Sequence, residues 1–395
     1  MFEKVSVEKC DSYDKELLNK CIDKAVDEIA GLDFVKRGMT VGLKVNLVSA
    51  ASPDEAVTTH PMVIRRLCER IVEMGAKVVI GDSPGGVFNK NFVYGIYKAC
   101  GLLDLEKEFE GNVKLNDDFS EKNAEYAEAV SIKTFTYTGW LDNVDAIVNI
   151  SKLKTHAMMG MSCAVKNMFG TIPGVMKPQY HMRFPNERAF ANVMVDLNEF
   201  FKPALYIVDA IDGMEGNGPT AGEKRHIGAV LASKKPYALD VVCADIIGMN
   251  MRDVPTIAAA FERGLGPESK ADVEIVTSDG GDCIKIPDFK RATIHQSIDF
   301  AGDGFGNKVK SLLVKFFLQT RPQVKKAECV GCKKCYETCP AKAITMVKRT
   351  VRGKEGFYPE IDRSKCIKCF CCQEFCPKGA MKVHENPVGK FARSI

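Results

Sequence analysis

The amino-acid sequence predicts an α/β domain with a mostly parallel sheet and helices on both faces, followed by a small α+β domain of the ferredoxin type. Strand and helix patterns alternate along residues 1–300, as they do where crossover helices join parallel strands. Two cysteine runs of equal spacing follow, at 329–340 and 366–377. We therefore expect an α/β domain at 1–300, a linker helix at 301–325 and an iron–sulfur domain at 326–395.

The α/β prediction rests on short apolar runs that alternate with amphipathic stretches. "PMVIRRLCERIVEMG" (61–75), for example, starts with proline and carries apolar residues at helical spacing. "AKVVIGDSPGG" (76–86) is apolar throughout its first half and then turns into glycines, as a buried strand does. In chain order, the expected strands lie at 39–48, 76–86, 144–156, 204–213, 227–233 and 271–279, and the expected helices at 61–75, 187–201 and 237–249.

Polar side chains gather where four of these strands end. Ligands of open α/β sheets bind beyond the carboxyl ends of the strands. Charged residues at the ends of several buried strands are also costly unless they are paired or used. The sequence therefore predicts a functional pocket there, and we take five residues as candidates for catalysis: Lys44, Lys154, His156, Lys166 and Asp209.

The charges of this pocket predict a small anionic substrate, a carboxylate or a phosphate. Lysines supply positive charge, and the glycine-rich loops 81–86 and 215–222 can present backbone N–H groups to an oxyanion. His156 and a lysine can donate protons during a reduction. Asp82 and Asp209 either chelate a divalent ion or hold the lysines in place. We expect no NAD site and no nucleotide-triphosphatase site, because neither fingerprint occurs.

Plainer explanations stand beside these. Lys44 in a strand is often a solvated edge residue, a single histidine such as His156 is often hydrogen-bonded filler, and both glycine-rich loops can be ordinary turns.

The two cysteine runs follow Cys-x2-Cys-x2-Cys-x3-Cys-Pro, the bacterial ferredoxin spacing in which the last cysteine of each run ligates the other cluster. The pattern predicts two 4Fe–4S clusters, and zinc, whose sites use paired cysteines, is the alternative. Residues 341–362 between the runs predict a brief helix and a hairpin. Cys371 is left over as a loop thiol. The predicted ligands are Cys329, Cys332, Cys335 and Cys376 for one cluster, and Cys366, Cys369, Cys372 and Cys339 for the other.

Charge is divided unevenly along the chain. Residues 301–395 contain 20 Lys and Arg against 8 Asp and Glu, which leaves 35 against 43 for residues 1–300. The basic tail can dock onto the acidic body or onto an acidic electron donor protein, ferredoxin- or flavodoxin-like. We expect no nucleic-acid partner, because no binding motif accompanies the charge.

Several features predict a cytoplasmic protein. No apolar run of membrane-spanning length occurs, and the first residues lack the pattern of a secretory signal. Clustered cysteines in a reducing compartment bind metal or do redox chemistry. Residues 305–322 form a basic amphipathic pattern that can lie on a membrane surface, although packing of the iron–sulfur domain against the body is the favoured role.

Short segments of the body, taken in their order along the chain, resemble the signature segments of the domain-of-unknown-function family 362. They are "LKVNLV", "GDSPGG", "SKLKTH", "VKNMFG" and "DGMEGNGP", together with the "HP" of residues 60–61. The resemblance covers about residues 1–300, and members of the family often carry the two-cluster ferredoxin module. It implies an iron–sulfur protein of anaerobic redox metabolism whose reaction is unassigned.

Three hypotheses of function follow. The leading one is an iron–sulfur oxidoreductase that delivers electrons to an anionic small molecule in the α/β domain. The alternative is a non-enzymatic ferredoxin-like electron carrier or adapter that docks a partner enzyme. The third is a non-redox catalyst with structural or sensory clusters. The first predicts a closed pocket near a cluster, the second a flat face, and the third clusters far from the pocket.

Overall fold

The computed structural model describes residues 3–184, 186–277, 284–292, 321–351 and 354–384. Its body is built on one nine-stranded sheet in the order β11-β1-β10-β9-β7-β2-β3-β4, with β8 paired to β7. The pairs β3–β4, β2–β3, β2–β7, β7–β9 and β1–β11 are parallel, whereas β10 is antiparallel to β9 and β1. The mostly parallel sheet is therefore confirmed. The strands are β1 (Glu3–Lys9), β2 (Thr40–Lys44), β3 (Lys77–Gly81), β4 (Val113–Leu115), β7 (Ala146–His156), β8 (Gly160–Ser162), β9 (Leu205–Glu215), β10 (Glu223–Ser233) and β11 (Val273–Val276).

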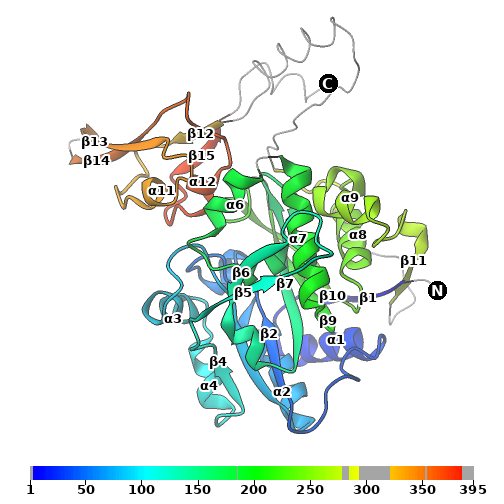
Figure 1. Ribbon diagram of the computed structural model, residues 1–395. Coiled ribbons are helices and arrows are strands. Elements are labelled where there is room, and N and C mark those ends of the chain that lie inside the picture. The colour runs from blue at the N-terminus through cyan, green and yellow to red at the C-terminus, as the bar shows by residue number, and fades with distance from the viewer. Residues whose placement is uncertain (1–2, 185, 278–283, 293–320, 352–353, 385–395) are drawn as a thin grey trace, which may run out of the picture.

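Both faces of the sheet are buried. Along β10, Val230 and Ala232 belong to one apolar core, and Ala229 and Leu231 belong to another, because successive side chains of a strand point to opposite faces. Residues of α1 and α2 complete the first core, and residues of α8 complete the second (Figure 1). The helices of the body are α1 (Lys15–Asp27), α2 (Pro61–Glu73), α3 (Lys90–Ala99), α4 (Leu103–Glu108), α5 (Ala164–Asn167), α6 (Lys177–Arg183), α7 (Glu187–Phe201), α8 (Pro236–Ile246) and α9 (Pro255–Glu262). No helix in the described ranges is long and apolar enough to span a membrane.

The expected elements match these bounds closely in the body. The helix expected at 187–201 is α7, and β2 ends at Lys44 rather than at residue 48 because the chain leaves the sheet there toward the pocket. The sequence interpretation had no strand for β1 and no helix for α1, and it missed the hairpin β5 (Glu121–Glu125) and β6 (Thr134–Thr138), whose first strand is almost wholly exposed and so lacks apolar alternation.

The C-terminal domain consists of two short antiparallel pairs and two helical turns (Figure 1). Two expectations need correction here. Residues 321–324, expected at the end of the linker helix, form β12, which pairs with β15; the rest of the expected helix, 301–320, lies outside the described residues. The brief helix expected after residue 341 is absent, and the helical turns lie at the cysteines instead. The elements are β12 (Arg321–Val324), α11 (Lys334–Glu337), β13 (Ile344–Val351), β14 (Lys354–Ile361), α12 (Cys371–Glu374) and β15 (Met381–His384).

Candidate functional site

Eight cysteines of the C-terminal domain surround two separate cavities. The cavities have empty volumes of about 360 and 320 Å³, and apolar residues together with lysines complete both linings. The cavities sort the cysteines into the same two sets that the spacing predicts, and ligation itself stays a prediction. Cys329, Cys332, Cys335 and Cys376 line the first cavity; Cys339, Cys366, Cys369 and Cys372 line the second.

The backbone of the two loops fits an iron–sulfur cluster. Gly331 and Lys368 occupy corresponding positions and have φ angles of 68° and 59°, and Lys333 and Phe370 have 64° and 58°. Left-handed residues within such loops let successive backbone N–H groups face an anionic centre, as in many iron–sulfur sites. In the described part of the chain, no three His, Cys, Asp or Glu side chains converge closely enough to hold a single metal ion. Thiols spread around a cavity suit a four-iron cube better than one tetrahedral zinc.

Cys371, the leftover thiol, is fully buried in α12 and lines neither cavity. Its expected lack of a ligand role stays a prediction.

Residues 373–375, which follow Cys372 in the chain, contact the body. Gln373 donates from Nε2 to the Asn217 carbonyl at 3.1 Å, and Thr220 donates from Oγ1 to the Glu374 carbonyl at 3.1 Å. The Phe375 ring lies against Gly85, where a Cβ atom would come within 1.8 Å of the ring. The glycine-rich loops 81–86 and 215–222 are thus the surface that receives α12.

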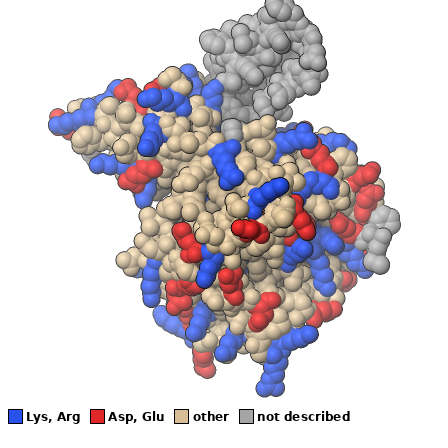
Figure 2. Space-filling model, in the orientation of Figure 1, with Lys and Arg blue, Asp and Glu red and all other residues tan. Residues whose placement is uncertain are grey.

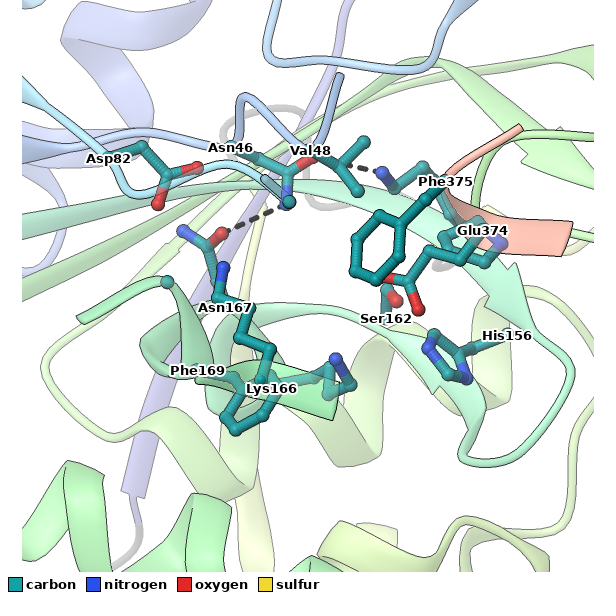
Figure 3. A pocket seen from close by; sticks show the side chains of 15 residues that line it. Asn46, Val48, Asp82, His156, Ser162, Lys166, Asn167, Phe169, Glu374 and Phe375 are labelled. Atoms are coloured by element: carbon teal, nitrogen blue, oxygen red, sulfur yellow. Dashed lines mark hydrogen bonds between the residues drawn. The ribbon is translucent and has the colours of Figure 1, made fainter. Parts of the chain in front are cut away.

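A pocket lies at this junction, at the carboxyl ends of the parallel strands (Figure 3). It has an empty volume of about 490 Å³ and takes its walls from both domains. Its lining consists of Asn46, Val48, Asp82, Gly85, Lys154, His156, Ser162, Lys166, Asn167, Phe169, Gly170, Lys177, Pro219, Glu374 and Phe375.

Two of its lysines are held by neutral oxygens. Lys154 donates from Nζ to Asn46 Oδ1 at 2.9 Å and to the Val57 carbonyl at 2.7 Å, and Lys177 donates to the Ser83 carbonyl. Neither has a carboxylate within ion-pair distance in the described ranges. Burial therefore lowers the pKa of Lys154 to about 7 and that of Lys177 to about 8.

Lys166 is the third cationic group of the pocket. Its Nζ lies 5.0 Å from the centre of the Phe169 ring, and within the described residues no hydrogen bond or ion pair holds it. Burial lowers its pKa, and the nearby Glu374 carboxylate opposes that shift. Figure 3 shows Lys166, His156 and Glu374 around the same space.

His156 presents a fixed donor. Its Nδ1 accepts hydrogen bonds from the backbone N–H groups of Met158 and Met159, both at 3.1 Å. A nitrogen that accepts carries no proton, so the ring proton of the neutral form sits on Nε2. That Nε2 is buried and has no partner among the described residues. Burial holds the pKa of His156 well below its usual value, so the ring stays a neutral N–H donor.

The two remaining candidates lie in ion pairs next to the pocket rather than in its lining. Lys44, which is fully buried and not a solvated edge residue, pairs with Asp82 at 2.8 Å. Lys152 pairs with Asp209 at 3.0 Å, and the Tyr13 hydroxyl donates to the same carboxylate at 2.9 Å. Asp82 and Asp209 were expected either to chelate a divalent ion or to hold the lysines in place. In the structure each of the two carboxylates pairs with a lysine.

The lining residues that sequence reasoning missed include Ser162, Lys177, Glu374 and Phe375. Ser162 lies between the strand expected at 144–156 and Lys166, but it is small and uncharged, so a search for charged residues passes over it. Lys177 lies 21 residues after that strand, beyond the segment that was searched. Glu374 and Phe375 lie between two predicted cluster ligands, and no sequence signal shows that this segment faces the body.

Two family models match the chain. One, described as domain of unknown function (DUF362), matches residues 41–245, and one described as a 4Fe–4S dicluster domain matches residues 328–380. The second match, with the cysteine cavities, marks an iron–sulfur-binding protein. A curated relative, the thylakoid-associated protein sll1697 of Synechocystis sp., is 29% identical over 326 residues, which cover 81% of this chain and 96% of the relative.

Solved structures show weaker likeness. A protein from Thermotoga maritima has a TM-score of 0.37 at 12% identity, over 58% of this chain and 57% of its own. The lactate racemase apoprotein from Thermoanaerobacterium thermosaccharolyticum has a TM-score of 0.36 at 12% identity, over 58% of this chain and 54% of its own. The chain thus spans little more than half the length of either structure.

Proposed function

The chain belongs to the DUF362 family, whose description assigns no reaction, and we propose that it is an iron–sulfur oxidoreductase that delivers electrons from two 4Fe–4S clusters to a small anionic molecule in the pocket. One observation carries this proposal. The pocket has walls from both domains, with Lys154 and His156 on the body and Glu374 and Phe375 on the cysteine-bearing segment.

The wall from the C-terminal domain is also part of the expected cluster support. Glu374 lies two residues from Cys372 and two from Cys376, and these cysteines line different cavities. Adjacent Cα atoms are about 3.8 Å apart, so the Glu374 backbone is within two residue lengths of a ligand of each set. Bound clusters would supply single electrons at this wall.

The body supplies the binding groups for an anion. Lys154, Lys166 and Lys177 face the pocket. Two carboxylates, Glu374 and Asp82, also line it, and Asp82 is paired with Lys44. The Nε2–H group of His156 adds a neutral donor that nothing in the described chain satisfies. A carboxylate or phosphate oxygen would give Lys166 and His156 the acceptor that they lack within the described residues, and it would give Lys154 and Lys177 a charged partner in addition to their neutral oxygens.

The same residues can supply protons. An organic molecule that gains electrons gains negative charge, and protonation must accompany the reduction. Lys154, with a pKa of about 7, and Lys177, with a pKa of about 8, exchange protons at Nζ near neutral pH. His156 can meanwhile hold the reacting oxygen through Nε2–H.

The carrier or adapter alternative requires a flat docking face at the strand ends. A pocket with walls from both domains, and with a buried donor that has no partner among the described residues, favours the oxidoreductase instead. We further propose that the protein acts in the cytoplasm, in anaerobic metabolism, because thiolate ligands and reduced clusters persist under reducing conditions.

Anaerobic mixing experiments test the proposal. The chemically reduced protein is mixed with small carboxylates and phosphates one at a time, and reoxidation is followed by visible absorbance. We expect at least one compound to accelerate reoxidation, and Lys166→Gln to abolish the acceleration without loss of iron. If every compound leaves the reoxidation rate unchanged, or if Lys166→Gln matches the wild type, the oxidoreductase proposal fails.

A further inference from the structure

We propose that the surface around Cys332 is the docking site of a small acidic electron-carrier protein, an inference that rests on the proposed function and names its electron donor. This surface, here called the Cys332 face, consists of Val330, Cys332, Lys333, Phe357 and Lys378. It lies in the C-terminal domain.

The members of the Cys332 face are contiguous. Val330, Cys332, Lys333 and Lys378 line the first cysteine cavity together. The Lys333 Nζ lies 5.8 Å from the centre of the Phe357 ring. A Cβ atom on Gly331 would come within 2.6 Å of the Phe357 carbonyl oxygen, so the cysteine loop touches β14 directly. Four of the five side chains therefore line the cavity, and the fifth, Phe357, packs beside Lys333.

This face is open, whereas the other end of the domain is covered. Cys332 is exposed, Val330 is 63% exposed and Phe357 is 51% exposed. By contrast, Cys371 and Cys372 are buried in α12, which docks on the body. The exposed side chains of the Cys332 face can therefore be reached by an external protein. The neighbouring Lys334 marks the edge of this face, because its Nζ lies 5.5 Å from the centre of the Phe92 ring of the body.

The charge of the domain favours an acidic partner. Residues 321–384 contain 15 Lys and Arg against 6 Asp and Glu, a net charge of +9. Two oxidised clusters with their thiolates would subtract about 4 and leave the domain basic. In the described residues, neither Lys333 nor Lys378 has a carboxylate within ion-pair distance. Figure 2 shows Lys and Arg side chains gathered on this domain.

Two apolar side chains beside two lysines that have no ion-pair partner among the described residues suit a transient redox interface. Such interfaces are small, and complementary charge mainly raises the rate of association. Val330 and Phe357 supply the apolar centre, and Lys333 and Lys378 supply the charge. Cys329, Cys332, Cys335 and Cys376 would hold a 4Fe–4S cluster in this cavity, and such a cluster would accept one electron from the reduced carrier. The carrier would be oxidised, with no bond formed or broken and no proton transferred.

Stopped-flow kinetics and calorimetry test the inference on the full-length protein loaded with clusters. The probe is a reduced plant-type [2Fe–2S] ferredoxin of net negative charge, and its oxidation is followed without substrate. We expect a second-order rate that falls as salt rises, and at least a tenfold loss at low salt in Lys333→Glu/Lys378→Glu. Calorimetry with the oxidised ferredoxin should show the matching loss of affinity.

Lys15→Glu/Lys20→Glu is the charge-matched control, because both lysines are exposed on α1, remote from the C-terminal domain (Figure 1). It should leave the rate unchanged, and dithionite should reduce all three proteins equally. Lys333→Gln/Lys378→Gln, with iron content checked, should give an intermediate rate. An unchanged rate in the double variant, a wild-type rate independent of salt, or equal losses with dithionite overturns the docking site. So does binding to anionic vesicles in place of ferredoxin.

The readout needs no substrate, so the two proposals fail separately. Rapid reduction by ferredoxin with no acceptor for the electrons contradicts the proposed function alone.

Discussion

His156 illustrates, at the scale of single residues, how a backbone contact sets the chemistry of a side chain. Two backbone N–H groups occupy Nδ1, and this fixes the proton on Nε2. Because the ring is 4% exposed, burial also keeps it uncharged. The pocket therefore contains a donor whose state does not change with pH near neutrality, beside lysines whose state does.

Two substitutions separate the structural and chemical roles of His156. His156→Asn keeps an acceptor for Met158 and Met159 near the Nδ1 position but removes the donor at Nε2. We expect its free energy of unfolding to stay within about 1 kcal/mol of the wild type. Substrate-dependent reoxidation should fall about 100-fold, as for the loss of a hydrogen-bond donor to the reacting oxygen. His156→Gln reaches the Nε2 position and should recover part of the rate; equal rates in Asn, Gln and wild-type proteins would rule out the role.

Lys154 and Lys177 predict a pH dependence of anion binding. Burial depresses their pKa values to about 7 and about 8, so both lose positive charge as pH rises through this window. Sulfate is a suitable probe because it does not titrate there. Calorimetry should show affinity that is highest well below pH 7 and falls as the pH rises through 7 to 8. Lys154→Met should weaken binding, and the remaining loss of affinity should occur near pH 8, where Lys177 loses its proton. A wild-type affinity that does not change with pH contradicts the prediction.

Single residues also show where sequence reasoning succeeds. Lys154, His156 and Lys166 were predicted from their place at strand ends, and all three line the pocket. Lys44 and Asp209 were predicted by the same rule but lie in buried ion pairs, because a strand end can point a charge into the sheet interior as readily as into a cleft. Pairing partners depend on tertiary packing, which a strand pattern does not contain.

At the scale of elements, the joint between α12 and the loop 81–86 decides whether the pocket exists. Phe375 fits only because Gly85 has no side chain, and hydrogen bonds from Gln373 and Thr220 fix the approach. The sequence predicts the strand before Gly85 and the cysteine run around Phe375 separately. Nothing in either pattern indicates that they meet, since the contact joins segments almost 300 residues apart.

Gly85→Val should separate the C-terminal domain from the pocket. The new side chain occupies the space of the Phe375 ring, so we expect wild-type iron content but loss of substrate-dependent reoxidation. Gly95→Ala is the matched control, because a Cβ atom at Gly95 meets nothing within 4 Å. Within α3 it should even stabilise the fold by about 1 kcal/mol. Normal reoxidation in Gly85→Val, measured under anaerobic conditions, would show that electrons take another route.

The whole molecule combines two halves that sequence reasoning predicts unequally. The spacing of the cysteines in the sequence predicts the two sets of ligands. Three thiols with two residues between each can enclose only part of a cube, so the fourth thiol must come from the other run. The placement of that domain on the strand ends does not follow, because it depends on surface fit. For the same reason the sequence did not predict Glu374, the acidic residue that the C-terminal domain contributes to the pocket.

Iron analysis tests the crossed arrangement of the two runs. Cys339 belongs to the first run but lines the cavity of the second set, whereas Cys371 lines neither cavity. Cys339→Ser should therefore lower the iron content by about half and remove the spectrum of one cluster, and Cys371→Ser should retain both. Full iron in Cys339→Ser, or zinc in the wild-type protein purified without oxygen, would contradict the arrangement.

The most direct test of the whole arrangement is nuclear relaxation of a bound anion. Acetate labelled with ¹³C at the carboxylate is titrated into the protein before and after chemical reduction. If the anion sits beside the cysteine-bearing segment, its carboxylate signal should relax much faster when the clusters are reduced, and Lys166→Gln should abolish the effect. An acetate signal that the reduced clusters leave unchanged would contradict an anion pocket at the cluster domain.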